Sequence, residues 1–213
     1  PTMKKLYTLF ISAALFSSAR AQLTQANHAP APGDTYQMLS VDTAGIKPGS
    51  AGTGVTWNFS SAGTSTNPSL TYTAVAASNP SFASANVAIG YSSSNIYYVN
   101  SGSNSLLYYG GNVEVETVKA SLNYSAPAIW ASYPMSFGTD SIKTTGGSII
   151  VSSPMSATGT FTGNSSVHAD GTGTLVLSTG SFSNVIRVRT TQTVDFSVQG
   201  GFVTGKLVQE TFE

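Results

Sequence analysis

Two glutamates near the middle of the chain have the spacing best suited to acid–base chemistry. Glu114 and Glu116 stand two residues apart in a segment with strand-like alternation, so both side chains are expected on one face, about 7 Å apart. Glycoside hydrolysis uses two carboxyl groups separated by about 5–9.5 Å, which makes a jelly-roll glycosidase one hypothesis for this chain. Alternation alone also explains the pattern as a solvated strand face with Val113 and Val115 inward, and we favour that interpretation.

Other arrangements that could carry catalysis are weaker. His168 and Asp170 could be combined with Asp140 as a metal site, but their spacing matches no known ligand pattern, and Asp170-Gly171 is more typical of a turn. The chain has no cysteine, which excludes a thiol nucleophile and thiolate ligands. It has no G-x-S-x-G elbow and only two histidines. We therefore predict no catalytic residue, no cofactor and no metal site, and we do not expect an enzyme.

Aromatic residues offer a different chemistry, the stacking of sugar rings. Tyr97-Tyr98 and Tyr108-Tyr109 are adjacent pairs in short strand-like segments, so one ring of each pair is expected to point outward. Outward rings would make these four tyrosines candidates for glycan stacking and the chain a carbohydrate-binding module. Cross-strand aromatic pairs also stabilise sheets by packing, which is the alternative interpretation. The wider set of candidate rings adds Tyr72, Tyr91, Trp130 and Tyr133.

The elements that would position these residues are strands, because the hydrophobic period is two. Over residues 186–198, one face carries Ile186 and Val188 and the other carries Arg187 and Arg189, which predicts a core face and a water face. Gly110-Gly111-Asn112 predicts a hairpin turn. Further strands are expected at residues 54–59, 70–75, 95–99, 105–109, 113–118, 148–152, 159–162, 174–177 and 202–209. Many short strands with regular turn signals predict an all-β fold, an antiparallel β-sandwich that is jelly-roll-like.

The N-terminus has the pattern of a secretory signal peptide. Lys4 and Lys5 precede an apolar run over residues 6–16, and Ala19-Arg20-Ala21 supplies small residues for cleavage between Ala21 and Gln22. The apolar run is too short for a membrane-spanning helix. We expect residues 1–21 to be the signal peptide with two preceding residues, and residues 22–213 to be one β-rich domain. The strand-like pattern at residues 207–212 suggests a natural protein that continues further.

Composition narrows the possible partners of the exported domain. Removal of the signal peptide leaves six of the nine basic residues against all nine acidic ones, so the domain is mildly acidic. Nucleic-acid binding needs a basic stripe, and we expect none here. No later apolar run is long enough to span a bilayer. The expected partners are the export machinery and, in the carbohydrate-binding alternative, a surface polysaccharide.

Three stretches of the chain match short motifs of a known family. Residues 49–60, GSAGTGVTWNFS, resemble the motif G-x-x-G-x-x-x-T-W-D-F-S, and residues 133–139, YPMSFGT, resemble Y-P-L-x-Y-G-T. Residues 169–175 and 180–188, ADGTGTL and GSFSNVIRV, resemble A-D-G-x-G-T-L and G-T-F-x-N-V-L-R-V. With these motifs the chain resembles the N-terminal domain of secreted Bacteroidetes proteins that end in a type IX secretion sorting domain.

The resemblance implies export and a cell-surface or extracellular location, and it implies no activity and no catalytic residues. This chain departs from the family in having Asn58 where aspartate is usual and in lacking the sorting domain. Bacteria of that family attach O-glycans at Asp-Ser/Thr-aliphatic sequences, which implies candidate sites at Thr43 and Ser141. Both lie near predicted turns, where a transferase can reach them. We predict a secreted or cell-surface module with an adhesion, matrix or spacer role.

Overall fold

A computed structural model describes residues 21–38, 41–42, 47–64, 70–92, 94–115, 117–199 and 203–213. The predicted signal peptide up to Arg20, and the candidate sites Thr43 and Glu116, lie outside the described residues. The helical elements are α1 (Gln25–His28) and the 3₁₀ turn η1 (Pro80–Phe82). The strands are β1 (Gln22–Leu23), β2 (Thr35–Met38), β3 (Val41–Asp42), β4 (Gly52–Phe59), β5 (Gly63–Thr64), β6 (Leu70–Ala76), β7 (Val87–Ser92), β8 (Asn95–Ser101), β9 (Ser105–Val115), β10 (Val118–Ser132), β11 (Met135–Ser136), β12 (Asp140–Ser153), β13 (Ala157–Leu177), β14 (Gly180–Val198) and β15 (Val203–Phe212).

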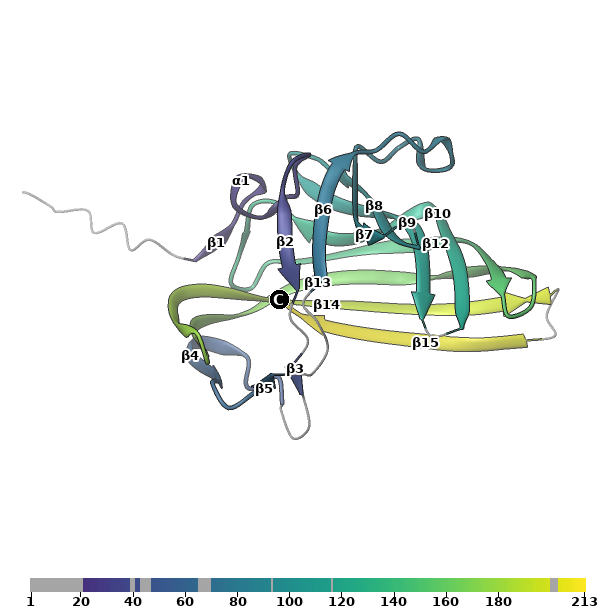
Figure 1. The fold of residues 1–213 in the computed structure, drawn as a ribbon. Coiled ribbons are helices and arrows are strands. Elements are labelled where there is room, and N and C mark those ends of the chain that lie inside the picture. Colours follow the sequence, from purple (N-terminus) through teal and green to yellow (C-terminus); the bar gives the residue numbers. More distant parts are fainter. Residues whose placement is uncertain are drawn as a thin grey trace, which may run out of the picture.

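The predicted all-β, sandwich-like class is confirmed, and one sheet dominates it. Its strand order is β15-β14-β13-β12-β10-β9-β8-β7-β6-β2, so neighbours in the sequence are mostly neighbours in the sheet (Figure 1). These pairs are antiparallel. β4 is the exception, because it pairs parallel with the C-terminal third of β13. The strand order, which the sequence left open, is a meander and differs from the Greek-key order of the jelly roll that we predicted.

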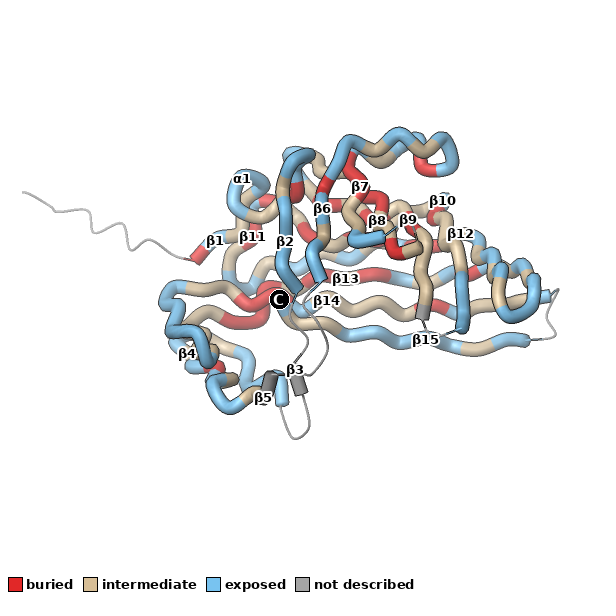
Figure 2. The backbone as a smooth tube through the Cα atoms, viewed as in Figure 1, coloured by how far each residue is buried: buried red, intermediate tan, exposed pale blue. Residues whose placement is uncertain are grey.

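The sheet curves over its own inner face, and the main core lies inside that curve. One cluster of buried side chains joins Ala74 of β6, Val99 of β8, Tyr124 of β10 and Val194 of β14, which are distant in strand order. Figure 2 shows the buried segments concentrated between the short upper strands and the long lower ones. A second cluster joins Met135 of β11, Val167 of β13 and Val188 of β14, and Leu23 of β1 packs against it. Curvature thus lets one sheet supply both layers of the sandwich.

The glycines at 110 and 111 do not form the predicted hairpin turn. β9 continues through them from Ser105 to Val115, and β10 begins at Val118. A Cβ at Gly110 would lie 2.0 Å from the Leu122 carbonyl oxygen, and one at Gly111 would lie 2.0 Å from the Ile96 carbonyl oxygen. These glycines let the backbones of β8 and β10 approach β9. Besides forming turns, glycine occurs inside strands where another backbone comes this close.

Two further strand segments differ from the prediction. β10 extends over Val118–Ser132, through Pro127, where the sequence predicts no strand between residues 118 and 148. The expected turn at Asp170-Gly171 is part of β13, where the pairing with β14 shifts register between Ala169 and Gly171. That shift is a β-bulge, which re-aims a side chain without ending the strand.

The close approach of β4 to β13 gives a testable prediction. Gly173 stands opposite Val55, and a Cβ there would lie 1.8 Å from the Val55 carbonyl oxygen. We expect Gly173→Ala to lower the free energy of unfolding by about 1–3 kcal/mol, the usual cost of overpacking, measured by urea titration. Gly102→Ala is the control, because its nearest neighbours are 3.4 Å away and its effect should stay within about 0.5 kcal/mol. Equal stability of the two variants would contradict the parallel pairing.

Candidate functional site

The most highly connected polar group of the described chain is an ion pair between Arg187 of β14 and Asp170 of β13. Arg187 Nε donates to Asp170 Oδ1 at 2.7 Å and Nη2 donates to Oδ2 at 3.0 Å, so the contact is bidentate. Both side chains are buried, at 8% and 7% exposed. The remaining guanidinium nitrogen, Nη1, donates to the carbonyl oxygens of Pro48 at 2.6 Å and Gly49 at 3.3 Å. The pair is thus hydrogen-bonded as a buried charge requires.

Aromatic rings complete the surroundings of the guanidinium. The Arg187 Cζ lies 5.1 Å from the centre of the Trp57 ring and 5.0 Å from that of Phe212, which are cation–π distances. Trp57 Nε1 donates to the Ser50 carbonyl oxygen at 3.1 Å. A Cβ at Gly171 would lie 2.6 Å from the Trp57 ring, so the glycine leaves room for the indole. We call Arg187, Asp170, Trp57 and Phe212 the arginine node.

The arginine node corrects the prediction that both arginines of β14 face water. Arg187 is on the expected face, but β4 and residues 47–51 cover that face with Trp57 and three carbonyl oxygens. Arg189, two residues on, is exposed as predicted and lies 3.6 Å from Glu210 of β15. Alternation predicts which side chains share a face of the strand. It does not predict whether a segment distant in the sequence covers that face.

Of the predicted carboxylate pair, Glu114 is among the described residues and Glu116 is not. Glu114, at the end of β9, lies 3.1 Å from the Lys119 ammonium of β10. Hydrogen bonds from Ser94 and Lys119 hold the pKa of Glu114 below its ordinary value. A glycosidase acid needs a carboxyl group with a raised pKa, so Glu114 does not suit that role.

The other candidate residues do not assemble into a reactive centre in the part of the chain that the structure describes. His168 Nδ1 lies 3.8 Å from Asp140 Oδ1 and has no hydrogen-bond partner. Asp170 is turned to Arg187 instead. Within those same residues, no group of three or more His, Asp or Glu side chains could hold a metal ion. His28 shares a hydrogen bond of 2.6 Å with the Tyr133 hydroxyl, whose pKa is raised by burial and by Glu213.

The tyrosine pairs do split across the two faces of the sheet, but neither supplies the predicted outward ring. Tyr98 is buried on one face, stacked on Phe82 at 4.1 Å, and the half-buried Tyr109 packs against the same cluster. On the other face Tyr108 is buried, and burial raises its pKa. Tyr97 packs beside it and is half-buried. Phe82 of η1 covers the Tyr98 ring, so the Tyr97-Tyr98 pair lacks the outward ring that we expected, and Tyr109 remains half-buried on the same face.

An aromatic row instead runs along the inner face toward the surface. The ring centres of Tyr124 and Tyr108 are 5.1 Å apart, those of Tyr108 and Tyr97 6.3 Å, and those of Tyr97 and Tyr72 6.4 Å. Tyr72 meets Tyr91 edge-on at 5.0 Å, and Tyr91 is 38% exposed. The row therefore begins in the core and ends at solvent.

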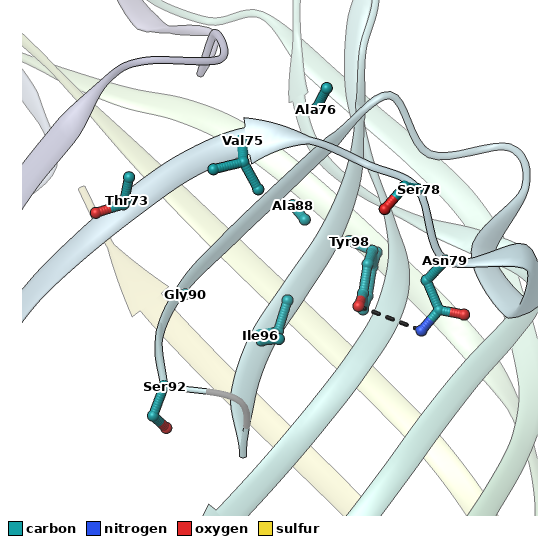
Figure 3. Close-up of a pocket in the computed structure, with 10 residues that line it drawn as sticks. All are labelled: Thr73, Val75, Ala76, Ser78, Asn79, Ala88, Gly90, Ser92, Ile96 and Tyr98. Atoms are coloured by element: carbon teal, nitrogen blue, oxygen red, sulfur yellow. Dashed lines mark hydrogen bonds between the residues drawn. The ribbon is translucent and has the colours of Figure 1, made fainter.

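A shallow pocket of about 280 Å³ lies on the opposite face of β6, β7 and β8 (Figure 3). Its lining includes Val75, Ser78, Gly90 and Ile96, and no acidic or basic side chain. Asn79 Nδ2 donates to the Tyr98 hydroxyl at 3.3 Å, and Asn79 Oδ1 accepts from the Ser81 amide at the start of η1. The Asn79 side chain thus holds η1 in place. The lining of the pocket offers no side chain for acid–base chemistry.

The candidate glycosylation site Ser141 is the second residue of β12, paired with Val167. Its side chain is half-buried and its hydroxyl donates to Ser132 Oγ at 3.1 Å. Ser141 thus lies in a paired strand, and not near an exposed turn as we expected. Glycosylation of Ser141 stays a prediction. Gln22, the predicted first residue after cleavage, begins β1 and pairs with Ser136.

Comparisons of the chain with protein families, with curated proteins and with solved structures find no match. No helix in the described ranges is long and apolar enough to cross a membrane. The arginine node was not predicted from the sequence. It joins two of the three stretches that resemble the known family, residues 49–60 through Trp57 and residues 169–188 through Asp170 and Arg187. The third stretch packs beside them, because Met135 contacts the cluster of Val167 and Val188.

The arginine node gives a second prediction. Arg187→Met leaves the Asp170 carboxylate buried without a partner, so we expect the free energy of unfolding to fall by about 3–5 kcal/mol. Arg187→Lys keeps the charge but loses the bidentate fork and should also destabilise the fold. The double variant Arg187→Met/Asp170→Leu should recover part of the loss, because no buried charge remains.

Arg189→Met is the matched control for these variants. Arg189 forms an exposed ion pair, and such pairs contribute about 0–1 kcal/mol. Thermal or urea unfolding of the natural chain and the four variants measures the differences in the free energy of unfolding. Equal losses for Arg187→Met and Arg189→Met would show that the arginine node does not stabilise the fold.

Proposed function

We propose that the chain is a non-enzymatic structural module, a β-sandwich that serves an extracellular surface protein as an adhesion, matrix or spacer unit. The observation that carries the proposal is that the residues best suited to chemistry have structural contacts. Asp170 is bound to Arg187, Glu114 to Lys119, and His28 to Tyr133. Tyr98 and Tyr108 are packed inside. A side chain held in this way supports the fold and is poorly placed to reach a substrate.

Export is the second part of the proposal. It rests on the signal-peptide pattern of residues 3–21 and on the resemblance to the N-terminal domains of type IX secretion substrates. The contacts among the three resembling stretches support the resemblance, because residues that hold a fold together recur wherever the fold recurs. The partners of the exported chain would then be the export machinery and the remainder of a surface protein.

Native secretion tests this proposal directly. We expect N-terminal sequencing of the protein recovered outside the cell to begin at Gln22, and its intact mass to exceed the unmodified chain if Thr43 or Ser141 carries a glycan. Hydrolysis assays on polysaccharide substrates should give equal results for the natural chain and for Glu114→Gln. An activity lost in Glu114→Gln alone would overturn the non-enzymatic proposal, and retention of the N-terminal segment inside the cell would overturn the proposed export.

One observation favours a carbohydrate-binding module as the second candidate. The aromatic row reaches solvent at Tyr91, and Tyr36 of β2 stands opposite Tyr72 in the register of β2 and β6. Tyr36 is 37% exposed and its hydroxyl donates to Asp34 at 3.2 Å. Exposed tyrosine rings beside a carboxylate combine a stacking surface with a hydrogen-bond acceptor, the usual composition of a sugar site.

A soluble-glycan array screened with residues 22–213 tests this candidate. If it binds, we expect Tyr91→Ala and Tyr36→Ala each to weaken binding about tenfold or more, as loss of a stacking ring does. Phe137→Ala is the control, since Phe137 is 47% exposed and lies outside the aromatic row. Binding to no glycan, or binding unchanged in Tyr91→Ala, would exclude this site.

A further inference from the structure

The long strand β15 forms one edge of the main sheet and has an open side. Among the described residues it pairs with β14 alone (Figure 1). The pairing is regular from Val203 to Phe212, without the bulges that interrupt β9, β10 and β13. Leu207 and Val208 are 53% and 60% exposed, so apolar side chains emerge on both faces of the strand. A long, regular and apolar edge is a template for another strand.

The hydrogen bonds at the end of β15 define which of its backbone groups point to the open side. Val188 and Glu213 exchange both of their backbone hydrogen bonds, at 2.8 and 2.9 Å. In an antiparallel pair such positions alternate along the strand. The odd-numbered residues of β15 therefore bond to β14, and the even-numbered ones direct their N–H and C=O groups outward. These outward residues are Thr204, Lys206, Val208, Glu210 and Phe212.

The charges of β15 are arranged symmetrically around one of these outward residues. Lys206 and Glu210 are both exposed, lie on one face of the strand and stand at equal distances in sequence on either side of Val208. In an antiparallel pair of two β15 strands centred on Val208, Lys206 stands directly opposite Glu210 of the partner subunit. The same register pairs even-numbered residues with even-numbered residues, as the outward hydrogen bonds require. The hydrogen bonds thus restrict the pairing to even-numbered residues, and the charges select the register centred on Val208 among those that remain.

We propose that two copies of this chain associate by antiparallel pairing of their β15 strands, with a two-fold axis at Val208. The two sheets then continue as one across the interface. Lys206 forms an ion pair with Glu210 of the partner subunit on each side of the axis, and Val208 contacts Val208 of the partner subunit. Closed two-fold pairing covers the β15 edge of both copies, so association through this edge stops at the dimer.

Charge reversal tests the proposed register. With residues 22–213 tagged at the N-terminus, sedimentation velocity over about 1–200 µM should reveal a concentration-dependent dimer, the range expected for a small interface. Lys206→Glu and Glu210→Lys each place like charges opposite one another twice, which should raise the dissociation constant about tenfold or more. The double variant Lys206→Glu/Glu210→Lys restores both pairs and should dimerise like the natural chain. Lys47→Glu, at an exposed residue outside β15, controls for net charge.

The design separates contacts between copies from contacts within one copy. Within a copy, Lys206 lies 3.8 Å from Asp195, and Glu210 lies 3.6 Å from Arg189. The double variant places like charges at both of these contacts. Recovery of the dimer in the double variant therefore has to come from the second copy.

A backbone substitution tests the edge pairing without relying on charge. Val208→Pro removes an N–H that points to the open side and leaves the bonds to β14 in place, so edge strands tolerate it. We expect a monomer whose circular dichroism matches that of the natural chain. A natural chain that stays monomeric throughout the concentration range would overturn the proposal. So would a dimer that Val208→Pro leaves intact, or a double variant that dimerises no better than either single variant.

Discussion

The contact on which the rest of the structure most depends is the bidentate ion pair of Arg187 and Asp170. Placing two charges in a protein interior costs several kcal/mol per ion, and only full hydrogen bonding offsets that cost. Here the guanidinium also bonds to Pro48 and Gly49 and lies between the rings of Trp57 and Phe212. The pair therefore ties residues 47–51, β4, β13, β14 and β15 to one point, although these segments are far apart in the sequence.

The sequence predicted the class of fold because strand periodicity is a local property. Residues 186–198 alternate cleanly, and β14 covers them. The burial of Arg187 was not predictable in the same way. It depends on the parallel pairing of β4 with β13. β4 precedes the paired part of β13 by more than a hundred residues in the sequence. The better signal was the combination of Trp57, Asp170 and Arg187 in two of the three resembling stretches, whose shared role appears only when β4 lies beside β13.

Glycine and tyrosine illustrate the same limit for the candidate site. Gly110 and Gly111 have the composition of a turn, but they lie where three backbones approach closely. Tyr98 had to leave the main core, since Tyr97 and Tyr108 already point into it. Whether its ring met solvent depended on residues 80–82, which bring Phe82 onto it. Local pattern could assign each ring to a face, and tertiary packing decided which faces were covered.

Among the described residues, β2 and β15 stand at the two ends of the strand order, and these two edges differ. β2 is four residues long, and a short edge offers little to a pairing strand. β15 is ten residues long and regular. The C-terminal end of β15 also belongs to the arginine node, because the Phe212 ring packs on Arg187. The next residue, Glu213, forms backbone hydrogen bonds with Val188. A strand needed to cover a buried charge cannot be shortened or bulged there without exposing that charge. The buried ion pair therefore constrains the C-terminal end of β15, the strand that has an open side among the described residues.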